Sequence, residues 1–291
     1  METESLVILD YSGTLSIRAP SFSHPEHLTA QLVECGLTDL GIDAVDTFWR
    51  EIVNPTWEEG STTAIGYVRL LEREIRKRLE RDATVESRKG EILDAASCFV
   101  DRYLDFSSID PRWQPLLTWL LTVPATMTVI ATDHYAEATD AIIGHLGWFR
   151  IEGTAIGNCS GNECRKGKIV VANSADLGAH KADPPFWQMI KAGLGLHALH
   201  RVLLVDDFGA HEDAGDDYGN RHHIARRCER TVKTLRAVFQ VPVKTVAFAA
   251  QRRDFPSGGT NGLDDLIRRA MDEVQRCLPG NHESIQRPSD Q

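Results

Sequence analysis

Acidic and hydroxyl side chains gather directly after short apolar runs of the sequence. The residues in these positions are Asp10, Ser12, Thr132, Asp133, Asp206 and Asp207. Lys181 is a further candidate, because it stands just before the Asp-Pro-Pro start of an expected helix. Carboxylates that share a site with a hydroxyl group and a cation can hold a phosphoryl group together with a hard divalent ion. Taken singly, each of these residues could equally form a turn or lie on the surface.

These residues can act together only if the apolar runs are strands of one sheet. The runs are Leu6–Leu9, Met127–Ala131, Val202–Val205 and Val243–Ala249. Helical patterns separate the later runs, as in Ala136–Leu146 and Phe186–Ala192. Strands that alternate with helices predict an α/β fold with a parallel sheet covered on both faces. Ligands of such sheets bind at the carboxyl ends of the strands, where the candidate residues would meet.

Residues 17–110 differ from the rest, because they show helical periodicity and no comparable strand. In the clearest helix, YVRLLEREIRKRLERD, one face carries Val68, Leu71, Ile75 and Leu79. We therefore expect an all-helical domain of residues 17–110, inserted into a core of residues 1–16 and 111–278. The polar residues 279–291 are expected to form a disordered tail.

Two segments leave alternatives open. NPTWEEGSTT, residues 54–63, is the least regular part of the insertion and is either a turn between helices or a substrate contact through Trp57 or Glu59. Residues 221–239 form a basic helix whose apolar stripe is Ile224, Cys228, Leu235 and Phe239. Its opposite face carries Arg226, Arg227, Arg230 and Lys233. That face is either solvated or a docking patch for an anionic partner.

Composition and charge exclude several classes of function. With a net charge of −10 over 291 residues, the chain lacks the basic face that a general nucleic-acid binder needs. No apolar run approaches the ~20 residues of a membrane helix, so no membrane partner is expected. The N-terminus, METESLVILD, lacks the basic start of a signal peptide. We therefore expect a cytoplasmic protein, and the sequence does not decide whether it forms a homodimer.

The cysteines support the same location. They stand at positions 35, 98, 159, 164, 228 and 277, too sparsely for a disulfide framework, so reduced thiols are expected. Cys159 and Cys164 bracket the polar turn CSGNEC. A zinc site there would need two further ligands at motif spacing, which the neighbouring sequence lacks, so we interpret these two as incidental thiols of a hairpin.

Four of the motifs, in order, resemble those of the haloacid dehalogenase-like (HAD) hydrolases. LDYSGTLS resembles the family's first motif, D-x-D-G-T, except at the second acid, and Thr132 matches the second motif. KADPPF, from Lys181, is similar to the third, and VDDFGA to the fourth. The agreement runs from residue 6 to about residue 218. It implies a Rossmann-like core with a helical cap of the C1 type, which is the insertion of residues 17–110.

The resemblance also implies roles for the candidate residues. Asp10 would be the nucleophile and would form an aspartyl phosphate. Mg²⁺ would be bound by Asp10, Asp207 and the backbone carbonyl of Ser12, with Asp206 acting through water. The phosphoryl group would be bound by Thr132, Asp133 and Lys181. The implied activity is a Mg²⁺-dependent phosphohydrolase acting on a small phosphorylated metabolite.

Ser12 stands where family phosphatases have the acid that protonates the leaving oxygen and later activates water. A hydroxyl group does this poorly near neutral pH, and such acid–base catalysis is worth roughly 10²–10⁴-fold. Phosphatase turnover therefore depends on what replaces this group, whereas the nucleophile and the metal ligands are retained.

Three consequences stay open. Another group could transfer the proton, and His134 and His211 follow the second and fourth motifs. The leaving group could need no protonation, as in P-type ATPases and in phosphonoacetaldehyde hydrolase, which breaks a C–P bond with a cap lysine; this cap contains Lys77 and Lys89. Catalysis could be lost, leaving a phosphate-binding or scaffold protein. The dehalogenase branch fits less well, since it has Tyr at the position of Ser12 and lacks the acidic pair.

Overall fold

The computed structural model describes residues 4–79, 86–159, 167–196, 198–211, 221–248 and 261–278. Cys164 and the predicted tail, residues 279–291, lie outside the described residues. None of the described helices combines the length and the apolar character needed to cross a membrane.

A parallel sheet of six strands forms the core, in the order β3-β4-β2-β1-β5-β6. The strands are β1 (Glu4–Asp10), β2 (Thr126–Thr132), β3 (Glu152–Ala155), β4 (Lys168–Asn173), β5 (Leu199–Asp206) and β6 (Val243–Ala247). The α/β class predicted from the sequence is confirmed. The sequence analysis missed β3 and β4: β3 is only EGTA on the sheet edge, although β4, KIVVAN, has the apolar run of a buried strand.

Side chains of the central strands alternate between two hydrophobic clusters, one on each face of the sheet. In β1, Val7 and Leu9 belong to one cluster, whereas Leu6 and Ile8 belong to the other. Burial on both faces explains why β1 is apolar from Leu6 to Leu9 without the alternation of a half-exposed strand. The run ends at Asp10 because the sheet ends there and the site begins.

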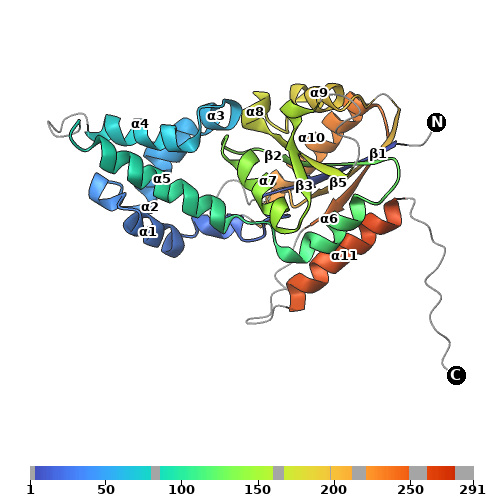
Figure 1. The fold of residues 1–291 in the computed structure, drawn as a ribbon, viewed down its shortest axis with the longest axis horizontal. Coiled ribbons are helices and arrows are strands. Elements are labelled where there is room, and N and C mark those ends of the chain that lie inside the picture. The colour runs from blue at the N-terminus through green and yellow to red at the C-terminus, as the bar shows by residue number, and fades with distance from the viewer. Residues whose placement is uncertain are drawn as a thin grey trace.

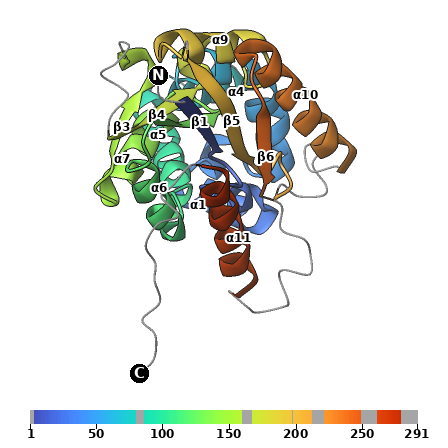
Figure 2. The ribbon, with the colours of Figure 1, turned by 90° about the vertical axis from the view of Figure 1, so that its right-hand side faces the viewer.

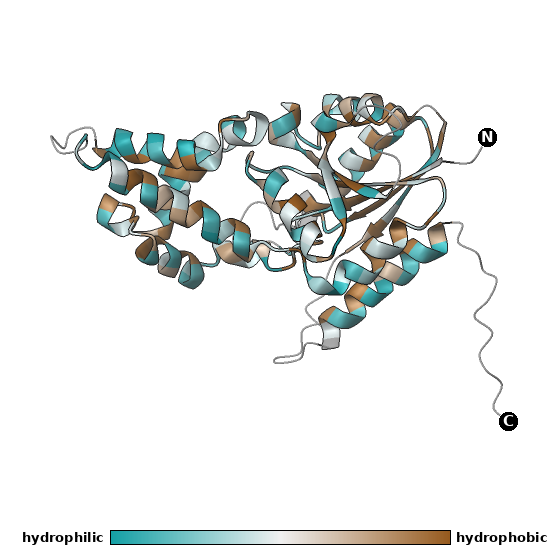
Figure 3. Ribbon diagram, in the orientation of Figure 1, coloured by the Kyte–Doolittle hydropathy of each residue, from teal (hydrophilic) through white to brown (hydrophobic). Residues whose placement is uncertain are grey.

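Helices cover both faces, as Figures 1 and 2 show. The first cluster is closed by α6 (Gln114–Leu120), α7 (Ala138–Trp148) and α11 (Asn261–Cys277). The second is closed by α9 (Pro184–Gly193) and α10 (Arg221–Phe239). The predicted apolar stripe of α10 is confirmed, since Leu235 and Phe239 are buried in this cluster and Ile224 and Cys228 pack against it. Figure 3 shows the resulting brown strands inside helices of mixed colour.

Within residues 17–110, helices form a cap with a hydrophobic cluster that Tyr135 of the core joins. Its helices are α1 (Pro25–Glu34), α2 (Val45–Phe48), α3 (Asn54–Thr62), α4 (Tyr67–Leu79) and α5 (Lys89–Phe106), with a π-helical turn, Trp49–Val53, joining α2 to α3. Residues 54–62, expected to be irregular, are therefore helical. Proline and glycine are common in turns, which is why Pro55 and Gly60 make this segment look irregular. Pro55 stands in the first turn of α3, where proline is tolerated.

Cys35 and Cys98 form a disulfide between the C-terminal end of α1 and α5, so reduced thiols were a wrong expectation for this pair. Cys159 is also disulfide-bonded and is not an incidental thiol. A sequence separation of 63 residues hides the first pair, which meets only because α1 packs on α5. The cysteines therefore no longer support a cytoplasmic location.

The cap is tied to the core at several points. The chain leaves and re-enters the core side by side, since the Asp110 N–H donates to the Leu15 carbonyl. Glu137, just before α7, accepts from the N–H groups of Tyr67 and Val68 and so caps the start of α4. The Oγ atom of Ser61 in the cap lies 2.8 Å from the Nε2 atom of His180 in the core. These contacts fix the cap over the carboxyl end of the sheet.

Gly60 sets how closely α3 approaches the segment after β2. A Cβ atom there would lie 2.5 Å from Leu70 Cδ1 and 2.5 Å from Tyr135 Cε1, and both side chains are buried. We expect Gly60→Ala to lower the free energy of unfolding by about 1–3 kcal/mol through overpacking. Urea unfolding measures the change.

Gly144→Ala is the matched control, because Gly144 also lies inside a helix and nothing lies within 4 Å of its Cβ position. It should stabilise by about 0.5–1 kcal/mol through helix propensity. Equal shifts in the two variants would contradict the close approach described for Gly60.

Candidate active site

The turn after β1 brings Asp10 against the end of β5. Gly13 has φ +78°, and a Cβ atom there would lie 2.5 Å from Asp207 Oδ2, so glycine is required both for the turn and for the approach. The Thr14 hydroxyl donates to Asp10 Oδ2 over 3.1 Å and accepts from the Asp207 N–H over 3.0 Å. Thr14 thereby locks the two acidic turns together, a role that the sequence analysis did not assign.

The acidic pair at the end of β5 is held by its own turn. The Phe208 N–H donates to Asp206 Oδ1 over 2.7 Å. The N–H groups of Gly209 and His211 each donate to the Asp207 carboxylate over 3.1 Å. These backbone donors orient two buried carboxylates toward Asp10. Oxygen atoms of Asp10, Asp206 and Asp207 all lie within 4.8 Å of one another.

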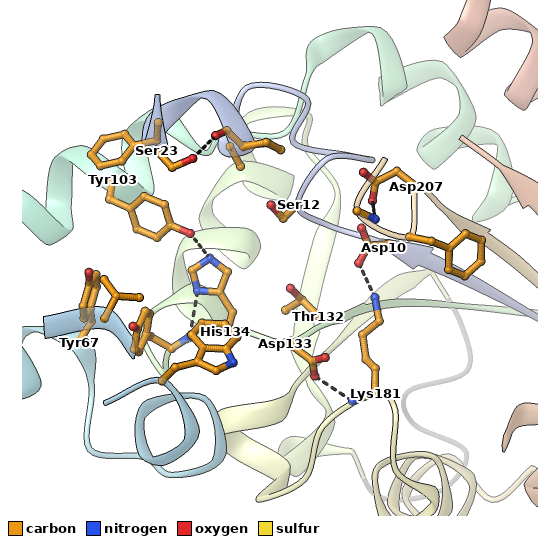
Figure 4. A pocket seen from close by; sticks show the side chains of 18 of the residues that line it. Asp10, Ser12, Ser23, Tyr67, Tyr103, Thr132, Asp133, His134, Lys181 and Asp207 are labelled. Atoms are coloured by element: carbon orange, nitrogen blue, oxygen red, sulfur yellow. Dashed lines mark hydrogen bonds and ion pairs between the residues drawn. The ribbon is translucent and has the colours of Figure 1, made fainter. Parts of the chain in front are cut away.

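Lys181 faces this cluster from the loop before α9 (Figure 4). Its Nζ atom lies 2.5 Å from Asp10 Oδ1 and 3.1 Å from Asp206 Oδ2. Its backbone is held at both ends: the N–H donates to Asp133 Oδ1 over 2.8 Å, and the carbonyl accepts from Trp187 Nε1 over 2.7 Å. Asp133 thus positions Lys181, and its predicted contact with phosphate stays a prediction.

The charges of this cluster do not balance. Burial would lower the pKa of Lys181, but Asp10, Asp206 and Asp133 outweigh it and raise that pKa well above its usual value. Burial also raises the pKa of Asp10 far above its usual range, against the opposing effect of Lys181. Like charges add to the rise, because the three clustered carboxylates face one lysine.

A divalent cation fits this arrangement. Three carboxylates provide the hard oxygen donors that Mg²⁺ prefers. A charge of +2 would balance the two negative charges that Lys181 leaves over, and it would offset the cost of burying them. The donor set therefore suits the predicted metal, and the choice of Asp10 and Asp207 as its direct carboxylate ligands stays a prediction.

A cavity of about 490 Å³ lies between this cluster and the cap, a size typical of small-molecule sites. Every residue predicted for the site lines it: Asp10, Ser12, Thr132, Asp133, Lys181, Asp206 and Asp207. Thr132 is buried and Ser12 is half-buried, and Figure 4 shows both facing the same hollow as Asp10. The structure therefore brings these residues together at one cavity, while their roles stay predictions.

His134 does not fit the role of a substitute proton donor. Its Nδ1 atom accepts from the Tyr135 N–H over 2.9 Å, so its proton is on Nε2, which donates to the Tyr103 hydroxyl 2.7 Å away. Burial lowers the pKa of His134 to about 4, which keeps the ring neutral near pH 7. His134 therefore holds Tyr103 in the cavity wall. The other candidate, His211, lies with Nδ1 3.1 Å from Asp207 Oδ2.

Two residues of α10 line the cavity although the sequence analysis did not place them in the site. Arg227 was expected on a face that is either solvated or a docking patch, and Thr231, one turn further on, was not assigned. Trp57 lines the cavity, whereas Glu59 forms an ion pair with Arg73 over 2.7 Å on the exposed side. The spacing of Arg227 and Thr231, four residues apart, was the available signal for a shared face.

The two cap lysines are not part of the cavity wall. Lys77 forms an ion pair with Glu74 over 2.8 Å and its side chain is 55% exposed. Lys89 begins α5 and is exposed. Among the described residues lining the cavity, the lysine is Lys181 of the core.

The chain was compared with family models, curated proteins and solved structures. No family model matches it, and neither does a curated protein. A solved structure similar to it is a 2-haloacid dehalogenase from Pseudomonas syringae pv. Tomato DC3000. The identity is 20%, with 75% of this chain and 84% of that chain covered and a TM-score of 0.45. A likeness this distant carries no argument about activity, which must come from the site itself.

The burial of neutral His134 predicts a stability that depends on pH. The ring takes up a proton near pH 6.5 in the unfolded chain but only near pH 4 in the folded one. The unfolded state therefore binds more protons between these values, and stability falls as the pH falls from 6.5 toward 4. The loss from this group should reach about 3 kcal/mol.

Urea unfolding of the wild type and His134→Gln at pH 7 and pH 4.5 measures this contribution. The variant should lose less stability between the two pH values than the wild type does. His200→Gln, which changes an exposed histidine, is the control and should behave as the wild type. Parallel losses in wild type and His134→Gln would show that His134 is not buried in its neutral form.

Proposed function

We propose that this chain is a HAD-like hydrolase that cleaves small phosphorylated compounds through an aspartyl phosphate on Asp10, with Mg²⁺ as cofactor. The observation that carries the proposal is the position of Asp10 at the end of β1. Its carboxylate faces Lys181 over 2.5 Å and lies in one cluster with Asp206 and Asp207, which line the cavity between the core and the cap. The order of the four motifs supports the family.

The residues of the site divide the reaction between them. Mg²⁺ would be held by Asp10, Asp207 and the Ser12 backbone carbonyl, and would offset charge on the transferring phosphoryl group. The free carboxylate oxygen of Asp10 attacks phosphorus, and the leaving oxygen departs on the opposite side. Lys181 and Thr132 stabilise the charge on the equatorial phosphoryl oxygens. Water then attacks phosphorus, which releases orthophosphate and restores Asp10.

Ser12 narrows the choice of leaving group. Ser12 stands in place of the second acid, and His134 is neutral and bonded to Tyr103. His211 does not line the cavity, so neither histidine candidate is placed to protonate a leaving oxygen. The proposed substrates are therefore compounds whose leaving oxygen is stable as an anion, such as acyl and aryl phosphates. Alkyl phosphates would react slowly because an alkoxide needs a proton.

The alternatives have less support. A C–P bond hydrolase needs a cap lysine in the cavity, whereas Lys77 is exposed in an ion pair and Lys89 is exposed. A dehalogenase has no use for three carboxylates in one cluster, which would repel a departing halide. A binding or scaffold protein stays an outcome of the experiments below, since it would bind a phosphorylated ligand without turning it over.

Asp10→Asn should abolish hydrolysis of acetyl phosphate and p-nitrophenyl phosphate in the presence of Mg²⁺. An amide cannot form the phosphoryl intermediate, so we expect a decrease in kcat of more than about 10³-fold. Release of orthophosphate over time is the measurement, with and without EDTA.

Asp265→Asn is the control, because this carboxylate pairs with Arg268 on the surface of α11. It should leave turnover unchanged. Full activity of Asp10→Asn would remove Asp10 as the nucleophile. Cleavage of phosphonoacetaldehyde by the wild type that is lost in Lys77→Met would favour the C–P bond reaction instead.

Ser12→Asp should restore the missing acid. We expect it to raise turnover of an alkyl ester such as glycerol 3-phosphate by roughly 10²-fold or more, while acetyl phosphate changes far less, because its carboxylate leaves unaided. The ratio of the two rates is the measurement.

Ser12→Asn is the control for size and polarity and should not change that ratio. Wild-type turnover of alkyl and acyl phosphates at equal rates would show that proton transfer is supplied by another group, and that Ser12 does not limit the substrate range.

A further inference from the structure

The two sides of the cavity differ in chemical character. Its charged lining residues come from the core: Asp10, Asp133, Lys181, Asp206, Asp207 and Arg227. Within residues 17–79 and 86–110 of the cap, by contrast, no residue that lines the cavity carries a charge. Aromatic residues dominate that side, among them Phe22, Phe48, Trp57, Tyr67, Phe99 and Tyr103. In Figure 4 the tyrosines lie across the hollow from Asp10 and Lys181.

The aromatic wall is packed firmly. The ring of Phe22 contacts those of Phe99 and Tyr103 edge-on, at centroid distances of 5.6 and 5.1 Å. Tyr67 stacks on Tyr135 of the core at 3.9 Å with the rings parallel. Phe22, Tyr67, Phe99 and Tyr135 are buried, so the wall is already formed without a ligand. Trp57, 36% exposed, packs edge-on against Tyr135.

This wall selects against polar substrates. A sugar or an amino acid would bring several hydroxyl or charged groups against a wall made mainly of rings, in which polar side chains such as Ser23 and Asn54 are few. Each such group that loses its bonds to water without replacement costs free energy. A planar apolar group would instead leave water and make edge or stacked contacts with several rings. The cap therefore favours an aromatic group attached to the phosphoryl group bound by the core.

We propose that the substrate is an aromatic acyl phosphate or an aryl phosphate, whose ring lies against the cap while its phosphoryl group lies between Asp10 and Lys181. The inference rests on the proposed function for the reaction and on the cavity wall for the ring. It names the leaving group: a carboxylate or phenolate joined to an aromatic ring.

The chemistry balances without an acid from the protein. An Asp10 oxygen forms a bond to phosphorus, while the bond from phosphorus to the leaving oxygen breaks and its electron pair stays on that oxygen as a carboxylate or phenolate. Water then forms the next bond to phosphorus. The bond to Asp10 breaks, its electron pair returns to the carboxylate, and both protons of water leave with orthophosphate.

Comparing benzoyl phosphate with acetyl phosphate tests whether the enzyme prefers a substrate with an aromatic ring. Their leaving groups are matched, because benzoic and acetic acid have similar acidity. We expect kcat/KM for benzoyl phosphate to be higher by about 100-fold, as burial of a ring in place of a methyl group allows. Trp57→Ala should lower the ratio of the two constants about tenfold, and Trp57→Phe should keep most of it. Trp148→Ala, an equally large change at a 65% exposed position outside the cavity, should not alter the ratio.

Binding of two stable phosphonates separates this inference from the proposed reaction. Benzylphosphonate and ethylphosphonate differ only in a phenyl in place of a methyl group, and calorimetry with Mg²⁺ measures both. We expect benzylphosphonate to bind about 100-fold more tightly, and Trp57→Ala to lose part of this difference. That result would support the aromatic site even if no phosphate is hydrolysed. In that case only the proposed reaction would fail. Equal affinities or no binding of either compound would overturn the inference, as would equal kcat/KM values for the two acyl phosphates.

Discussion

The ion pair between Lys181 and Asp10 is the interaction on which the rest of the site depends. Burying a carboxylate or an ammonium group costs several kcal/mol unless partners compensate for lost water. Here Asp10 receives Lys181 and the Thr14 hydroxyl, and Asp206 and Asp207 receive backbone N–H groups of their own turn. The glycine that follows Ser12 leaves the space for these turns to meet. The geometry of these turns is therefore set by the need to give each buried charge partners that replace its lost water.

The segment after β2 carries that constraint into the cap. Asp133 fixes the backbone of Lys181, and His134 donates to the cap tyrosine Tyr103. Tyr135 stacks on a second cap tyrosine, and Glu137 caps the first turn of α4. These residues follow one another in the chain, so a displacement of the cap would also disturb the loop that presents the lysine. The short segment from Asp133 to Glu137 thus fixes the aromatic half of the cavity relative to the charged half.

Most of the core side could be predicted from the sequence because strand ends are marked by local signals. An apolar run that stops at an acid is visible within ten residues, and the topology of a parallel sheet brings such ends together, as it does for Asp10 and Asp206. The short edge strand β3 gave no such signal, since EGTA is neither long nor apolar.

The cap side could not be predicted, because its contacts join residues that are far apart in the chain. Tyr103 meets His134 through the packing of α5 beside the loop after β2, and Cys35 meets Cys98 across two helices. Periodicity put Arg227 on a solvent face, yet part of that face of α10 is turned toward the cavity. Helical periodicity shows which residues share a face. It does not show what the polar face of a helix will meet.

In the proposed reaction, Ser12 and the aromatic wall would restrict the substrate in the same direction although they belong to different parts of the fold. Without an acid, the leaving oxygen must be stable as an anion, which requires its charge to be delocalised. Phenolates delocalise that charge into an aromatic ring, and carboxylates share it between two oxygens. The wall formed by Phe22, Phe99 and Tyr67 offers its contacts to rings of this kind. The serine in the turn after β1 would thus be matched by the shape and polarity of the cap, because in the proposed reaction both act on the same group of the substrate.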